Sequence, residues 1–301
     1  MSERKLTIDP IVGIKAKADI DQVLVIGCGG TGGFFIRDIA RSISTMKVQP
    51  ELVLIDGDTV EEKNLKRQNF IAADIGRNKA DVLAGRYSTL GLKVAFSGKF
   101  LEKAEDLQAI LDTKKCSLIV SCVDNVKTRA LIRQAYLGSK QACSYWIDCG
   151  NEEFTGQVVL GCKANNWTPE TMRAGQYPVP DVFDLYPELH ERAKIDKLPT
   201  EMSCAELAAA SPQYGFVNAT AAVFAINFAH DLLMKSEITT HMVEFTIKNK
   251  FSHRSPSRSA LIGWKKTFTP IAAHNFEKMW EKPGFAPLPP AEKFVPIVTF
   301  N

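Results

Sequence analysis

The stretch QVLVIGCGGTGGFF at residues 22–35 decides the fold. Its first part, QVLVI at 22–26, is a short continuous apolar run, which is typical of a strand buried on both faces of a parallel sheet. The glycine turn, residues 27–33 with the sequence GCGGTGG, follows at once and leads into a predicted helix at 34–44. Glycines there let backbone N–H groups at a helix N-terminus approach phosphate oxygens, so the segment predicts a nucleotide site. The turn alone does not distinguish a dinucleotide from ATP.

Strand and helix patterns alternate through the first half of the chain. Further strands are expected at 52–55, 93–97, 117–122 and 145–148, and helices at 78–90, 104–111 and 126–137. Such alternation implies right-handed crossovers, and therefore a Rossmann-like α/β fold with a mainly parallel sheet covered by helices on both faces.

The pattern changes after residue 155, where we expect an antiparallel second half. A strand is predicted at 156–162, and strands at 242–247 and 260–264 could form a hairpin. The segment 163–203 is rich in Pro, Asn, Tyr and charge and predicts a long, weakly structured loop. A helix is predicted at 216–235, with a small-residue face that we expect to pack on the sheet: Ala219, Ala222, Val223 and Ile226.

Composition excludes several classes of protein. The chain has 301 residues, 45% apolar and 24% charged, and a formal net charge of +3, which is too mild to favour nucleic acid or a membrane surface as a partner. The longest apolar helical stretch, 215–234, contains Asn218, Asn227 and His230, so no membrane span is expected. The first residues lack a secretory signal, and seven cysteines in such a chain are expected to be reduced thiols. No cysteine spacing is C-x-x-C, which argues against structural zinc. We therefore expect a cytoplasmic protein.

Charged residues follow the predicted strands. Asp56, at the end of the second strand, can accept hydrogen bonds from ribose hydroxyls in NAD-binding and ATP-binding folds alike. Arg67 and Lys79 can bind a triphosphate, since arginine reaches two oxygens at once. Asp124 lies just past the strand at 117–122 and can hold Mg²⁺.

A simpler interpretation exists for each residue singly. Arg67 or Lys79 could be solvated surface residues, and Asp124 or Asn125 could cap the helix that begins at Val126. Their joint occurrence at successive strand ends favours one shared anionic ligand.

Five motifs in this order make the chain similar to a known family. They are GCGGTG at 27–32, LIDGDTV at 54–60, NLKRQ at 64–68, Lys79 at a helix start and CVDN at 122–125. The chain resembles the ThiF/MoeB family, which includes the adenylating domains of ubiquitin-activating enzymes. The resemblance covers residues 20 to about 160 and then thins to SCAE at 203–206 and the helix at 215–235. The segment SPQYGFVNATAA at 211–222 is most similar to ThiF-like proteins of plasmid-borne PRTRC systems.

The resemblance implies an adenylyltransferase: ATP- and Mg²⁺-dependent adenylation of the C-terminal glycine carboxylate of a ubiquitin-like (β-grasp) protein, by a homodimer. Residues 1–160 would form the nucleotide-binding half, and residues 161–301 would complete one adenylation domain with a crossover loop, a helix and strands. Asp124 would bind the metal, and it would act in catalysis with Arg67 and Lys79. The residues expected to contact the nucleotide are Gly27, Gly29, Gly30, Gly32, Asp56, Asp58, Asn64, Arg67, Gln68, Lys79 and Asn125.

Cys204 has two interpretations. Its position resembles that of the family cysteine that accepts the activated partner as a thioester or a persulfide-linked species, whereas a free cysteine is more often a small buried hydrophobic residue. The family's zinc-binding cysteine pairs are missing here. The family's arginine donated between subunits has only Arg4 as a counterpart before residue 37, and its role is left open.

Other functions account for parts of the pattern. Some family members activate a small-molecule or tRNA carboxylate, and a non-catalytic partner subunit could keep the fold for binding alone. An NAD-linked oxidoreductase would leave Arg67, Lys79 and Asp124 without a common purpose.

Overall fold

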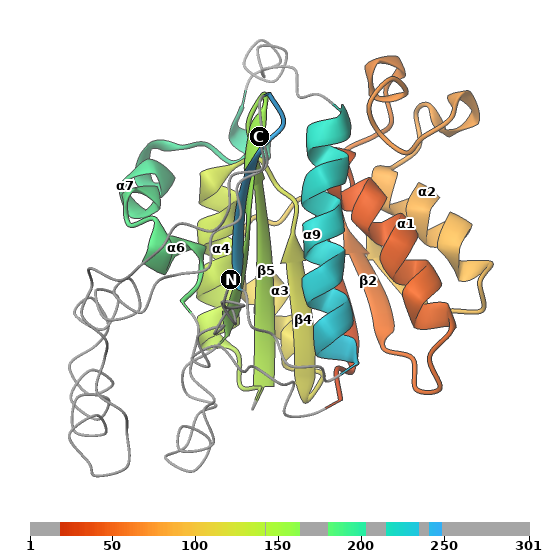
Figure 1. Cartoon of the computed structure of the whole chain (residues 1–301), viewed down its shortest axis with the longest axis horizontal. Coiled ribbons are helices and arrows are strands. Elements are labelled where there is room, and N and C mark those ends of the chain that lie inside the picture. Colours follow the sequence, from red (N-terminus) through yellow and green to blue (C-terminus); the bar gives the residue numbers. More distant parts are fainter. Residues whose placement is uncertain (1–18, 142, 163–179, 203–214, 235–240, 249–301) are drawn as a thin grey trace, which may run out of the picture.

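Seven strands form one sheet in the order β3-β2-β1-β4-β5-β6-β7 (Figure 1). The computed structural model describes residues 19–141, 143–162, 180–202, 215–234 and 241–248. The strands are β1 Gln22–Ile26, β2 Glu51–Ile55, β3 Val94–Ser97, β4 Cys116–Ser121, β5 Cys143–Asn151, β6 Thr155–Cys162 and β7 Met242–Thr246. The helices are α1 Gly30–Ser44, α2 Lys79–Ser88, α3 Ala104–Leu111, α4 Val126–Gly138, α6 Val182–Leu185, α7 Glu188–Ile195 and α9 Gly215–Leu233, with 3-10 turns η2 Glu62–Asn64, η3 Ala72–Asp74 and η5 Pro199–Glu201.

The first five strands are parallel, and the last two are antiparallel to their neighbours. β1 pairs with β2 and β4, while β6 returns beside β5 and β7 pairs with β6. Strand order therefore reverses between β1 and β4, where doubly wound sheets bind their ligands. The predicted Rossmann-like, mainly parallel sheet with an antiparallel continuation is confirmed.

Both faces of the sheet are buried under helices. Alternate β1 residues Val23 and Val25 belong to one core with residues of α1, α2 and α9. The intervening Leu24 and Ile26 belong to a second core with residues of α3, α4 and α6. This arrangement explains why the strand is apolar without alternation. Successive side chains point to opposite faces of the sheet, and an apolar layer covers each face.

Helix α9 packs along α1 (Figure 1) through part of the face predicted for it, since Ala222 is buried and Ile226 packs against the core. Its buried residues include Ala221, Ala225 and Ala229, whereas Val223 is 53% exposed. The prediction was wrong at Val223 because a helix that is apolar on most sides carries no periodic signal for its buried face. By length and a mean hydropathy of 1.3, α9 is the one helix within the described ranges that could cross a membrane, and half of that window is buried in the fold.

The described part of the segment 163–203, residues 180–202, contains more regular structure than its sequence predicts. The helices α6 and α7 lie within it. Asp181 caps α6 by accepting from the backbone N–H of Phe183, and Arg133 of α4 pairs with Asp181 and Asp184 at 2.8 and 2.6 Å. Helices of four and eight residues are too short to show a helical period, so they depend on tertiary contacts: α6 on those with Arg133, and α7 on packing against α4.

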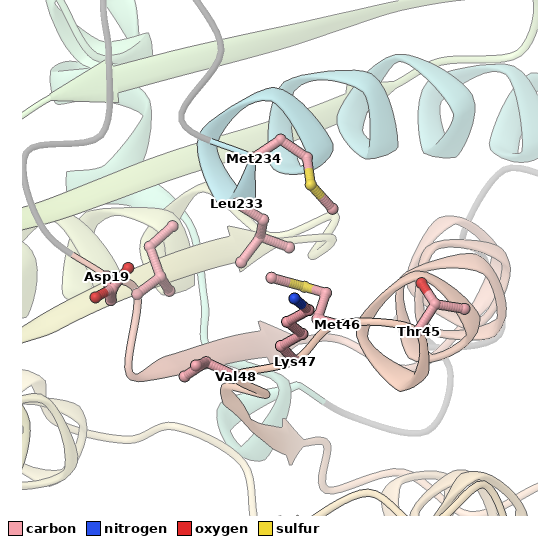
Figure 2. A pocket seen from close by; sticks show the side chains of 8 residues that line it. Asp19, Thr45, Met46, Lys47, Val48, Leu233 and Met234 are labelled. Atoms are coloured by element: carbon pink, nitrogen blue, oxygen red, sulfur yellow. The ribbon is translucent and has the colours of Figure 1, made fainter.

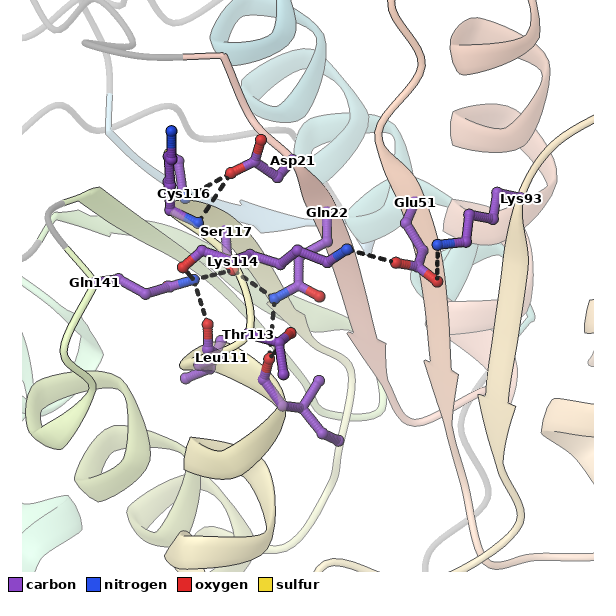
Figure 3. Close-up of polar contacts among 12 residues, drawn as sticks. Asp21, Gln22, Glu51, Lys93, Leu111, Thr113, Lys114, Cys116, Ser117 and Gln141 are labelled. Atoms are coloured by element: carbon purple, nitrogen blue, oxygen red, sulfur yellow. Dashed lines mark hydrogen bonds and ion pairs between the residues drawn. The ribbon is translucent and has the colours of Figure 1, made fainter.

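Polar side chains join the strands at the amino-terminal edge of the sheet (Figure 3). The amide Nε2 of Gln22 and that of Gln141 both donate to the Ser117 hydroxyl, at 2.7 and 2.6 Å. Glu51 pairs with Lys114 at 3.0 Å. These contacts fix the start of β1, β2 and β4 at the edge away from the glycine turn.

Candidate active site

The glycine turn follows β1 at the carboxyl edge of the sheet. Gly27 has φ +90°, which glycine adopts readily, and its N–H donates to the Ile55 carbonyl at 2.9 Å. A Cβ on Gly32 would lie 1.8 Å from the Gly27 carbonyl oxygen, so the close approach of turn and helix requires glycine there. Helix α1 begins at Gly30, four residues earlier than predicted, and no side chain caps its N-terminus. Its first N–H groups are therefore suited to an anion.

Asp56 connects the end of β2 to the glycine turn. One carboxylate oxygen accepts from the Cys28 N–H at 2.6 Å, and the other accepts from the Asp58 N–H at 2.8 Å. Burial raises the pKa of Asp56, while the Lys79 ammonium opposes that shift. The side chain is thus fixed where acidic residues of this fold class accept ribose hydroxyls.

Lys79 lies inside the protein. Its Nζ donates to the Asp58 carboxylate at 2.8 Å, with the lysine side chain 7% exposed and the aspartate 54% exposed. Asn78, the N-cap of α2, donates to the backbone carbonyls of Asp56 and Asp58 and so ties α2 to the loop after β2. The interpretation of Lys79 as a solvated surface residue is therefore wrong.

The side chains of the NLKRQ segment have different environments, and one of them lies against the glycine turn. Gln68 lies against Gly29, since a Cβ on Gly29 would be 3.5 Å from its Nε2, and its buried Oε1 has no hydrogen-bond partner within the described residues. Arg67 is half-buried, and its guanidinium makes no hydrogen bond or ion pair in that part of the chain. Asn64 is buried, and its Oδ1 accepts from the Glu61 N–H at 2.8 Å, so it shapes the loop.

Asp124 and Asn125 end the β4 motif in different ways. Asp124 is exposed, and its carboxylate has no hydrogen bond or ion pair to another described residue. Asn125 is the N-cap of α4: its Oδ1 accepts from the Thr128 N–H at 2.8 Å, and its Nδ2 donates to the Lys197 carbonyl. Both ends of the Asn125 amide are therefore engaged in holding the backbone, as the capping interpretation predicts.

A buried ion pair supports this loop, and the sequence analysis did not find it. The Arg129 guanidinium donates to the Val123 carbonyl at 3.0 Å and the Cys149 carbonyl at 3.1 Å, and it lies 3.5 Å from the Asp148 carboxylate. Burial raises the pKa of Asp148, and the nearby Arg129 opposes the shift. Arg129 lies one helical turn after Asn125, which was the only signal in the sequence.

Two features do not belong to the site described above. Cys204, predicted to act in catalysis, lies outside the described residues. A pocket of about 310 Å³ opens at the far edge of the sheet, between the ends of α1 and α9 (Figure 2). Its lining includes Met46, Lys47, Leu233 and Met234, none of which is a predicted site residue. Among the described residues, no three His, Cys, Asp or Glu side chains form a group that could hold a metal.

Two curated proteins are similar to part of the chain. The NEDD8-activating enzyme E1 catalytic subunit of Saccharomyces cerevisiae is 27% identical over 145 residues, which are 46% of this chain and 46% of that protein. Ubiquitin-like modifier-activating enzyme 5 of Dictyostelium discoideum is 25% identical over 152 residues, which are 46% of this chain and 38% of that protein. The matched region spans less than half the length of these relatives.

Solved structures share the fold over a longer range. A crystal structure of PaaA covers 78% of this chain and 72% of its own, with a TM-score of 0.55 and 16% identity. MccB of E. coli, solved with ATP, covers 83% of this chain and 65% of its own, with a TM-score of 0.53 and 15% identity. The model described as the ThiF family matches residues 10–258, and the chain therefore belongs to the ThiF family.

Proposed function

We propose that this protein uses ATP and Mg²⁺ to adenylate the C-terminal glycine carboxylate of a ubiquitin-like protein. The observation that carries the proposal is the set of groups at the carboxyl edge of the sheet, near the reversal between β1 and β4. The start of α1 is uncapped there, and Lys79 is buried. Arg67 and Asp124 have side chains without a partner among the described residues. Two cations and a helix N-terminus suit a triphosphate. The two curated relatives are activating enzymes for NEDD8 and a ubiquitin-like modifier, which supports this substrate class.

The reaction joins two anions. A carboxylate oxygen of the substrate attacks the α-phosphorus of ATP, the bond from that phosphorus to the oxygen shared with the β-phosphorus breaks, and pyrophosphate leaves with the electron pair. Arg67 and Lys79 neutralise the phosphate charge, and the N–H groups at the start of α1 orient the phosphates. Asp56 holds the ribose.

Asp124 fits the role of a magnesium ligand. It is one exposed carboxylate without a described partner, and Mg²⁺ commonly takes one or two carboxylates together with phosphates and waters. Bound there, the metal ion would reduce repulsion between the phosphates and the incoming carboxylate.

The test is exchange of labelled pyrophosphate into ATP, stimulated by a candidate ubiquitin-like protein. Asp124→Ala should abolish exchange, whereas Asp106→Ala, which removes an exposed aspartate of α3, should not change it. Full exchange by Asp124→Ala would remove that residue from the mechanism.

A second candidate is activation of a different carboxylate. MccB of E. coli, whose fold is similar, has been solved with ATP and with MccA, so the fold is compatible with other substrates. Exchange that needs no ubiquitin-like protein would favour this candidate.

Three further parts of the proposal concern the whole protein. Cys204 would attack the adenylate carbonyl as a thiolate, form a thioester and release AMP. Cys204→Ala should then keep exchange but lose a thiol-cleavable adduct. We also propose that residues 161–301 complete the adenylation domain and that the protein forms a homodimer in the cytoplasm. Sedimentation tests the dimer, and cell fractionation tests the localisation.

A further inference from the structure

Asn218 is a buried residue of α9 with one end of its amide unused. The side chain is 1% exposed, and its Oδ1 accepts from the Thr31 hydroxyl at 3.3 Å and the Asn151 amide at 3.1 Å. Thr31 belongs to α1 and Asn151 ends β5, so donors from two elements fix the orientation of the amide. Its Nδ2 has no hydrogen-bond partner within the described ranges. A buried donor without a partner is costly, so a ligand that accepts from it would be favoured.

The unused Nδ2 points at the glycine turn. A Cβ built on Gly30 would lie 2.2 Å from this atom, so the amide occupies the space over the first residue of α1. That helix has no side-chain cap at its N-terminus. Helix α9 runs beside α1 (Figure 1), which brings a residue of the second half of the chain to the turn that ends β1.

We propose that Asn218 is a further nucleotide-binding residue, whose Nδ2 donates a hydrogen bond to a phosphate oxygen of bound ATP. The inference rests on the proposed function. A phosphate is favoured over the carboxylate of the second substrate for a reason of position. Nδ2 lies beside Gly30, the first residue of the uncapped helix α1, and the N–H groups at such a helix start bind phosphate in this class of fold. An amide donor adds to these groups without introducing a buried charge.

The test measures binding of α,β-methylene-ATP with Mg²⁺ and of adenosine by calorimetry. Asn218→Ala should weaken binding of the ATP analogue about 10- to 100-fold, as expected for a lost hydrogen bond to a charged group, and leave adenosine affinity unchanged. Asn218→Asp keeps the bonds from Thr31 and Asn151 but replaces the donor by an acceptor, so it should weaken the analogue at least as much. Asn227→Ala, at an exposed position of the same helix, is the matched control and should change neither affinity.

Each outcome separates the two proposals. Unchanged binding of the ATP analogue by Asn218→Ala would overturn the role of Asn218 alone. An equal loss for adenosine and the analogue would also overturn it, since it would assign Asn218 to packing of the turn. If Asn218→Ala does not fold, near-normal binding of the analogue by Asn218→Asp overturns the inference. Failure of the unmodified protein to bind the analogue would instead refute the proposed function.

Discussion

Replacing glycine by alanine at two helical positions tests the geometry of the glycine turn. At Gly85 in α2, an added Cβ would meet nothing within 4 Å. At Gly32 in α1, it would lie 1.8 Å from the Gly27 carbonyl oxygen and 2.9 Å from its carbon, which are backbone atoms that cannot rotate away. Gly85→Ala should stabilise the protein by about 1 kcal/mol, because alanine has the higher helix propensity. Gly32→Ala gains the same term but adds an overpacking cost of about 3 kcal/mol, for a net loss of about 2 kcal/mol.

Urea unfolding at 25 °C measures both changes in the free energy of unfolding, which should differ by about 3 kcal/mol between the variants. Binding of Mg-ATP should be lost in Gly32→Ala, because the turn must move to admit the methyl group, and kept in Gly85→Ala. If Gly32→Ala is as stable as Gly85→Ala and binds ATP normally, the close approach of α1 to Gly27 is not what requires glycine.

Two more predictions concern a residue of the proposed site and the pH dependence of stability. Arg67→Ala should reduce pyrophosphate exchange at least about 100-fold, which is the size expected for a lost transition-state contact. It should change the free energy of unfolding by less than about 0.5 kcal/mol, because the guanidinium has no partner among the described residues. The control Lys66→Ala, at an exposed neighbour, should change neither quantity, and a loss of stability in Arg67→Ala alone would contradict the prediction. Burial lowers the pKa of His241 to about 4. The unfolded chain then binds more protons between pH 6.5 and 4, so stability should fall by about 3 kcal/mol as pH decreases through this range. His241→Leu should remove this acid dependence in pH-dependent melting, whereas the exposed His230→Gln should retain it.

Local patterns were sufficient for the first half of the fold. The helix predicted at 104–111 is α3 with the same bounds, and the run at 22–26 is β1. The position of Asp56 at the end of β2 follows from the strand before it alone, while its role toward a ribose stays a prediction. Each of these features is encoded within a few residues, so no knowledge of distant contacts is needed.

Features that depend on distant contacts could not be predicted in this way. The bond between Thr31 and Asn218 joins residues 187 positions apart, and nothing near Asn218 in the sequence indicates that it faces Gly30. The capping role of Asn125 was one of two interpretations, and only the position of Lys197 shows that both ends of its amide are engaged. The choice among apolar α9 residues likewise depends on where α1 lies.

The reversal of strand order explains why these residues meet. Helix α1 covers one face of the sheet and α4 covers the other, so the chain leaves the carboxyl ends of β1 and β4 in opposite directions. In doubly wound sheets, connections that diverge in this way leave a crevice at the strand ends, which is the general reason that such sheets bind ligands there. The glycine turn and Asp124 begin these two diverging connections, and Asn218 reaches the same edge through α9, which packs on α1. The second half of the chain thus contributes directly to the edge at which the nucleotide is proposed to bind.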